Sequence, residues 1–508
     1  MALIKLVLAL SVAARAAAFS RPAGPRSPFA RRAALFAHDD VSRRSALLTS
    51  TSVGGAVVST LLRAPATAAA AEPSTVWKGL TPQGPFFHGD RRRTVLRELV
   101  PGQMWALEQV QGVIYVHVPV RMTLVRTDAA GLVAYGAVAP TGEMLALLER
   151  VERELARCRL AHVILPSTAI EHKLFALAVA DKRADCTLWS APDQFAFPLD
   201  LPARAIGFPG GARARDVPRA WAADATPWAR ELEFRTLGPF VSKDGVSNYE
   251  EVVAYHAASR TLLVCDLLVS VPAAPPDAVR ANDARALWYH ARARAEDEVA
   301  GPADGDAALL ARREAEGWQK IALFSLYFQS GALRVTAEPD GTARGALAFF
   351  DGAFPPGVSA RARALGWGAF FAWAWPDERA WRESFFELAL DGAPLVPPIL
   401  AVAILNRDPR RVVDFVDEFC AAWPFERFVG CHFDAPARCN ARSVRDAFRF
   451  LEEGAELNDR QARRRGRQPD GDLAFLRNFE KTLVEANAIY PRGPLVPQAA
   501  AAARRGLF

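Results

Sequence analysis

The sequence predicts a layered α/β domain in which strands run in both directions. The chain is 508 residues long and 51% hydrophobic, which is enough to bury a sizeable core. Its first candidate elements follow the order strand, strand, strand, helix, strand, helix, strand. Consecutive strands before alternating helices and strands are typical of a mixed sheet covered by helices.

The three opening strands are short runs rich in Val, Tyr and Thr. They are GVIYVHVPV (112–120), RMTLVRT (121–127) and GLVAYGAV (131–138). DAAG, between the last two, predicts a hairpin turn.

An amphipathic helix follows in PTGEMLALLERVERELARC (140–158). Thr141 can cap it, and Leu145, Leu148, Val151 and Leu155 fall on one face. The pattern continues with a strand, a helix and a strand in AHVILP (161–166), EHKLFALAVADK (171–182) and DCTLWSAP (185–192).

A second β section begins near residue 231. Strands are expected at 231–238, 249–256 and 261–268, the last two joined by AASR as a hairpin. Residues 275–318, rich in Ala, Pro, Gly and charge, are expected to form an excursion rather than a core element. Further on, the sequence predicts a helix, a strand and two helices at 408–423, 425–433, 443–454 and 470–489.

Two strongly aromatic runs stand between these sections. They are GWQKIALFSLYF (317–328) and LGWGAFFAWAW (365–375). Aromatic clusters belong to a core, to a lid that packs on it or to a ligand pocket.

The formal charge of +6 would suggest nucleic acid as a partner, but it is concentrated at the N-terminus. Residues 1–71 hold nine Lys/Arg and only two acidic residues, Asp39 and Asp40. Residues 72–508 therefore hold 53 of the 62 basic and 54 of the 56 acidic residues, a net charge of −1. Nucleic-acid binding therefore loses its main support.

Residues 1–71 are expected to be a targeting leader in three parts. A lysine and an apolar run precede Ala16-Ala17-Ala18, as in a secretory signal. The stretch that follows is rich in Arg and free of acidic residues, as in a transit peptide. Arg43-Arg44 then precedes a moderately apolar run, as in a twin-arginine signal. Phe19 after the first cleavage region resembles algal plastid presequences. We expect plastid targeting, to the thylakoid lumen, and a mature chain that starts near Glu72.

No transmembrane segment is expected in the mature chain. Leu47–Leu62 is shorter and more polar than a bilayer span requires, although a retained signal anchor is the alternative.

The six cysteines form no C-x-x-C pair, which argues against a zinc ribbon or a thioredoxin-like motif. Cys431 could pair with Cys439 or Cys420 in an oxidising compartment. Buried free thiols are the other interpretation.

Several blocks resemble an uncharacterised cyanobacterial and plastid domain-of-unknown-function family. They are GVIYVHVPVRMTLVR, VAPTGE, ILPSTAIEHKLF, TLLVCDLLVSVP, GWQKIALF, PPILAVAILNR and VGCHFDAP. That family is similar to the metallo-β-lactamase fold, an αββα sandwich. The resemblance implies such a domain over 105–455 with a helical and aromatic insertion at about 275–395, preceded by an extension (72–104) and followed by a tail (456–508) with an amphipathic helix.

Hydrolases of that fold carry T-H-x-H-x-D-H after a strand, and LPSTAIEHK departs from it. Ser167 and Ala169 replace the first two histidines, Glu171 replaces the aspartate, and His172 matches the final histidine. The ligands of the first metal are therefore missing, and we expect that metal to be absent.

The same resemblance aligns Asp266 with the metal-bridging aspartate and His432 with the last histidine. Glu171, His172, Asp266 and His432 would then form the second metal's ligand set, for one divalent ion such as Zn, Fe or Mn. Glu171 could instead be a general base held by His172. The structural alternative is that Glu171 complements the helix dipole and the other three are polar remnants.

The other candidate residues have structural interpretations. His117 and His256 lie in period-2 strands, and Arg121 is a charge in an apolar strand that needs an ion-pair partner if it is buried. His290, beside an aromatic run, could belong to a substrate pocket.

Two functions remain open. One is a lumenal mononuclear metal-dependent hydrolase of a small ester, thioester or phosphoester. The other is a non-catalytic binding or assembly protein, for example for a photosynthetic complex, because one fold hosts many functions.

Overall fold

The computed structural model describes residues 72–77, 91–113, 116–194, 207–243, 245, 248–282, 284–294, 297–299, 301, 306–337, 372–453 and 470–497. Apart from Glu72, these residues belong to one compact unit that includes Pro73–Phe508. The predicted targeting leader (1–71), the basic run RQARRRGR (460–467) and most of the aromatic run 365–375 lie outside the described residues.

The first sheet has seven strands in chain order. They are β1 (Val95–Val100), β2 (Met104–Val113), β3 (Val116–Thr127), β4 (Gly131–Tyr135), β5 (Leu160–Leu165), β6 (Thr187–Ser190) and β7 (Ala214–Asp216). β1 to β4 are antiparallel and β4 to β7 are parallel, which confirms mixed strand directions. The turn 128–131 is the predicted hairpin, since Thr127 pairs with Gly131.

The second sheet has five strands in the order β14-β13-β10-β9-β8. Their bounds are β8 (Leu232–Val241), β9 (Asn248–His256), β10 (Thr261–Val264), β13 (Arg427–Gly430) and β14 (Ala437–Arg438). β9 and β10 form the predicted hairpin, and β10 pairs in parallel with β13. β10 and β13 are shorter than the sequence predicted, because the chain leaves the ladder at Cys265 and at Cys431.

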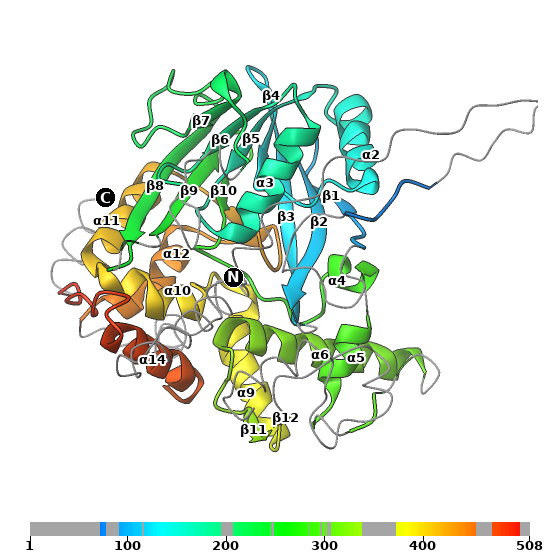
Figure 1. Cartoon of the computed structure of the whole chain (residues 1–508), viewed down its shortest axis with the longest axis vertical. Helices are drawn as coiled ribbons and strands as arrows, with labels where there is room; N and C mark the ends of the chain where they lie inside the picture. Colours follow the sequence, from blue (N-terminus) through cyan, green and yellow to red (C-terminus); the bar gives the residue numbers. More distant parts are fainter. Residues whose placement is uncertain are drawn as a thin grey trace, which may run out of the picture. The chain divides into compact units, whose positions relative to one another are not determined.

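Apolar side chains from both sheets form the central core, including Val133, Ile164, Phe234, Leu263 and Val429. Helices cover the two outer faces. The first sheet carries α2 (Gly142–Arg150), continued by the π-helix η2 (Val151–Leu155), and α3 (Ile170–Lys182); the second carries α10 (Pro398–Ala403), α11 (Pro409–Ala422) and α12 (Ala441–Ala447) (Figure 1).

These layers confirm the predicted α/β class and the predicted αββα sandwich. The cap of α2 is confirmed too, because the Thr141 side chain accepts the Met144 N–H at 3.1 Å.

The insertion forms a third packed region rather than an excursion. It contains α4 (Asp277–Asn282), α5 (Arg285–Ala291), α6 (Ala307–Tyr327), β11 (Arg334–Ala337), β12 (Ala372–Ala374) and α9 (Glu378–Ala389). The prediction for 275–318 was wrong, since Leu287, Tyr289 and Trp318 are fully buried in a common core. A composition rich in Ala and charge concealed these few large apolar side chains.

One further difference concerns strand bounds, whereas the predicted tail helix is confirmed. Residues 112–127 are not two strands: β3 begins at Val116 and runs on to Thr127, and β2 begins earlier, at Met104. The tail helix α14 (Asp470–Glu485) is present, and it packs on α10 and α6. Within the described residues, every helix is too short or too polar to cross a membrane.

Candidate metal centre

His172 reaches the interior from the first turn of α3. β5 ends at Leu165, and a turn leads into the helix at Ile170. Within this turn the Ser167 hydroxyl accepts the Ala169 N–H at 3.1 Å. His172 is fully buried, so the turn aims its imidazole into the protein.

Asp266 follows β10 and is held there by Glu251 of β9. The Glu251 carboxylate accepts the backbone N–H groups of Cys265 at 2.8 Å and Asp266 at 2.9 Å, and the Tyr249 hydroxyl at 2.6 Å. The backbone that carries Asp266 is therefore fixed by a buried acceptor on the neighbouring strand.

His432 follows β13, in a loop that Arg121 of β3 holds. The buried Arg121 guanidinium donates to the carbonyl oxygens of Gly430 and, at 2.7 Å, of Phe433. His432 Nδ1 lies 2.9 Å from the Pro119 carbonyl oxygen. Because that oxygen can only accept, Nδ1 carries the hydrogen and Nε2 presents its lone pair.

Three donor atoms meet at this point. His172 Nε2 and His432 Nε2 are 3.2 Å apart, and Asp266 Oδ1 lies 3.6 Å from the first and 3.3 Å from the second. A tetrahedral zinc with bonds of about 2.0–2.1 Å holds its ligand atoms about 3.3–3.4 Å apart. The triangle therefore matches one face of such a coordination sphere.

The protonation states also suit a metal. Burial lowers the pKa of His172, and the neighbouring Asp266 only partly offsets this. Burial acts to raise the pKa of Asp266, but His172 and His432 hold it well below its usual range. Asp266 Oδ1 is buried and accepts no hydrogen bond within the described part of the chain. A neutral imidazole and an unsatisfied carboxylate oxygen are the forms that bind metals.

Glu171 is buried beside His172 but is not among the converging donors. Within the described residues, two groups of side chains have ligand atoms that all lie within 4.8 Å of one another. Glu171 is fully buried but belongs to neither group. Its role as ligand or base stays a prediction. The Ser167 hydroxyl lies 3.5 Å from the other oxygen of Asp266.

A cavity of about 30 Å³ opens beside Asp266 and His432. The insertion contributes to its wall through Ser325 and Leu326 of α6, and Pro397 lines it as well. This volume holds only one or two waters.

The remaining candidates contact other partners. His256 Nδ1 is 2.7 Å from the Ser259 hydroxyl, and His290 is stacked on Trp373 within the insertion. The predicted ion pair of Arg121 is with Glu108, at 2.6 Å. Glu251 was missed in the sequence, although a carboxylate inside the buried strand NYEEVVAYH is a signal for it.

Comparison with known families gives one match over most of the chain. The family described as Domain of unknown function (DUF4336) matches residues 101–450, more than half of the sequence. No curated protein matches.

Solved structures similar to this chain are metallo-β-lactamases. The FIM-1 enzyme of Pseudomonas aeruginosa, in its mono-zinc form, is 10% identical, with 34% of this chain and 67% of that chain covered and a TM-score of 0.24. The Pontibacter korlensis enzyme is 11% identical, with 45% and 83% covered and a TM-score of 0.26. The Hirschia baltica enzyme is 8% identical, with 45% and 82% covered and a TM-score of 0.26.

Proposed function

Because the chain belongs to the DUF4336 family, whose description assigns no activity, we propose a function from the site itself: a mononuclear metal-dependent hydrolase of a small ester, thioester or phosphoester. The observation that carries the proposal is the triangle of His172 Nε2, His432 Nε2 and Asp266 Oδ1. His172, Asp266 and His432 hold one divalent ion of the Zn, Fe or Mn class.

A bound ion would act as a Lewis acid and lower the pKa of a bound water. The chain's own residues prepare the site for it. Pro119 fixes the tautomer of His432, and Glu251 fixes the backbone of Asp266. Partners of this kind orient ligands and raise their affinity for the ion.

The small cavity limits the substrate. Leu326 and Ser325 of α6 lie against it, so even a compact acyl or phosphoryl group reaches the space beside His432 only if the insertion moves. This closure also favours the second candidate function, a non-catalytic metal-binding or assembly protein. The thylakoid lumen, and a partner in a photosynthetic complex, remain proposals drawn from the leader.

Metal analysis of the purified protein tests the site. With Mn²⁺ as the added ion, we expect one ion per chain, lost in His172→Ala and in His432→Ala. His162→Ala is the matched control, since this half-buried histidine packs on Trp189 and Trp228 instead. Retention of a full equivalent of metal by both site variants would refute the proposed centre.

Hydrolysis of small activated esters, thioesters and phosphoesters then separates the two functions. Turnover that needs the ion and disappears in His432→Ala supports the hydrolase. A stoichiometric ion without turnover of any of these substrates supports the non-catalytic protein.

A further inference from the structure

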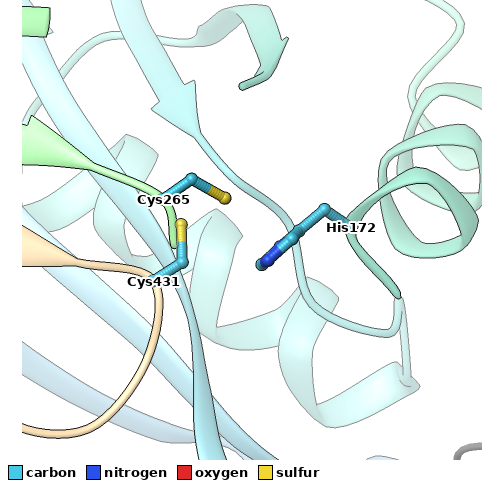
Figure 2. Close-up of side chains that lie close together, drawn as sticks. All are labelled: His172, Cys265 and Cys431. Carbon is cyan, nitrogen blue, oxygen red and sulfur yellow. The ribbon is translucent and has the colours of Figure 1, made fainter. Parts of the chain in front are cut away.

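Two cysteines lie beside the same imidazole. Cys265 Sγ, Cys431 Sγ and a nitrogen of His172 all lie within 4.8 Å of one another, and all three residues are buried. Figure 2 shows the side chains pointing toward one another from the end of β10, the end of β13 and the first turn of α3. The disulfide partners that the sequence suggested for Cys431, Cys439 and Cys420, are not in this group.

The pairing of β10 with β13 brings the sulfurs together. The strands run parallel with Val264 opposite Gly430, so the next residues, Cys265 and Cys431, lie side by side. The Cys431 N–H reaches the carbonyl oxygens of Val264 at 3.1 Å and Cys265 at 3.3 Å. The sulfur positions are thus set by backbone register.

Gly136 keeps the Cys431 sulfur in this place. The glycine has a φ of +73°, and a Cβ there would lie only 2.9 Å from Cys431 Sγ. The absence of a side chain at 136 is what leaves room for the sulfur.

We infer that Cys265, Cys431 and His172 form a second binding site, for a thiophilic ion such as Zn²⁺. Two sulfurs and one imidazole are a soft donor set of the kind that selects zinc over magnesium, calcium or manganese. Zinc bonds of about 2.3 Å to sulfur and about 2.0–2.1 Å to nitrogen place the sulfurs about 3.8 Å apart and each sulfur about 3.6 Å from the nitrogen. Because the three atoms lie within 4.8 Å of one another, the cluster reaches this geometry by a contraction of about 1.2 Å or less.

Charge balance favours an ion at this depth. On binding, each thiol loses its proton to solvent and each sulfur forms one bond to the ion, so no oxidant or reductant is needed. Two thiolates then neutralise the charge of a divalent ion, whereas an uncompensated charge would be costly in the buried core.

This site goes beyond the proposed hydrolase centre and does not depend on it. The two donor sets share His172, and one imidazole nitrogen binds only one ion. A thiophilic ion bound to both sulfurs and to the His172 nitrogen that faces Asp266 would occupy a donor that the proposed hydrolase centre needs. Such an ion would therefore displace an ion at that centre. Hard ions such as Mn²⁺ would remain with Asp266 and His432.

Cobalt(II) distinguishes the two donor sets, because cobalt bound to thiolate has an intense charge-transfer band in the near ultraviolet. We expect this band when Co²⁺ is added to the reduced, full-length chain. Cys265→Ser and Cys431→Ser should lose it, while Cys186→Ser, a buried thiol outside the cluster, should keep it. Asp266→Asn should keep the band as well, because it removes only the oxygen ligand.

The spectrum of the unsubstituted protein decides the matter even if a variant fails to fold. Absence of the band with folded, reduced protein would overturn the inference. Mass spectrometry that finds a chain lighter by two hydrogen atoms, with the peptides of Cys265 and Cys431 linked to each other, would overturn the inference in favour of a disulfide. Cobalt binding without the band, abolished by Asp266→Asn, would overturn the sulfur site and leave the proposed hydrolase centre intact.

Discussion

The Arg121–Glu108 pair and the His172–Asp266–His432 cluster both bury charge and both contact the loop that carries His432, yet they differ in how completely their polar atoms are used. Arg121 gives one hydrogen bond to Glu108 and two to loop carbonyls, and Glu108 also receives Arg97 at 3.3 and 3.4 Å. In the cluster, Asp266 Oδ1 and His172 Nδ1 are buried and make no hydrogen bond among the described residues.

This difference in hydrogen bonding distinguishes a group that supports the fold from a group that can bind a ligand. A fully hydrogen-bonded buried pair gains little from any further partner and serves to fix its neighbours. A buried carboxylate oxygen that lacks a hydrogen bond carries a desolvation cost, which a ligand can remove. We therefore assign Arg121 and Glu108 to positioning of the His432 loop, and the cluster to metal binding.

The largest expected effect is on the supporting pair. Arg121→Met leaves two loop carbonyls without their donor and Glu108 with only its longer contacts to Arg97, and should lower the free energy of unfolding by about 3–5 kcal/mol. Urea denaturation measures this. Arg379→Ala, which breaks an exposed pair with Glu383 on α9, is the control and should leave the free energy of unfolding almost unchanged. Equal losses in the two variants would show that the buried pair has no special weight.

A third buried charge, Lys320, shows what hydrogen bonds without a buried counterion achieve. Its ammonium donates to the carbonyl oxygens of Ala291 and Arg292 and lies over the Trp381 ring, and burial lowers its pKa to about 8.

Between pH 8 and 10.5 the unfolded chain therefore binds more protons at this lysine than the folded chain, so its contribution to stability rises with pH. Relative to Lys320→Met, the wild-type protein should gain up to about 3 kcal/mol over this window. Denaturation of both proteins at several pH values measures the difference. A difference that is constant with pH would contradict a depressed lysine.

Metal addition tests the cluster in the same units. Mn²⁺ at 100 times its dissociation constant should raise the free energy of unfolding of the wild-type protein by about 2.7 kcal/mol. Asp266→Asn should show almost none of this gain, and the control His162→Ala should show all of it. A hard ion is used because it avoids the thiols. Equal stabilisation of the wild-type protein and Asp266→Asn would place the ion elsewhere.

The sequence predicted the hairpins and the helix cap because these features depend on local sequence signals. The hairpins at 128–131 and 257–260 and the Thr141 cap depend on residues within a few positions of one another. His172, Asp266 and His432 were identified through resemblance to a family. Their convergence within 3.6 Å could not be predicted from composition or periodicity.

What the sequence could not predict depends on contacts between distant segments. Glu171 and His172 are neighbours, but consecutive helical residues project about 100° apart, so a helix that begins at Ile170 does not aim both at one point. The cysteine pair is another example, because 166 residue positions separate Cys265 from Cys431 and only the parallel register of β10 and β13 joins them. The same register brings Asp266 close to His432.

The smallest expected effect concerns Glu251. Its carboxylate oxygens all have hydrogen-bond donors, like those of the supporting Arg121–Glu108 pair, yet it contacts the backbone of the metal ligand Asp266. Both of its oxygens accept backbone N–H groups, and burial together with Asp266 raises its pKa to about 8. Glu251→Gln keeps the shape but offers a single acceptor oxygen, so the N–H of Cys265 or Asp266 loses its partner. Mn²⁺ affinity should fall about 10- to 100-fold, as it does when the partner of a metal ligand is removed. Tyr249→Phe, which removes only the phenol hydrogen bond to the same carboxylate, should change the affinity less. Isothermal titration gives the affinity, and denaturation of the metal-free proteins gives the accompanying stability. A variant that loses stability but binds Mn²⁺ as tightly as the wild-type protein would place Glu251 with Arg121 and Glu108, as support for the fold and not for the ion.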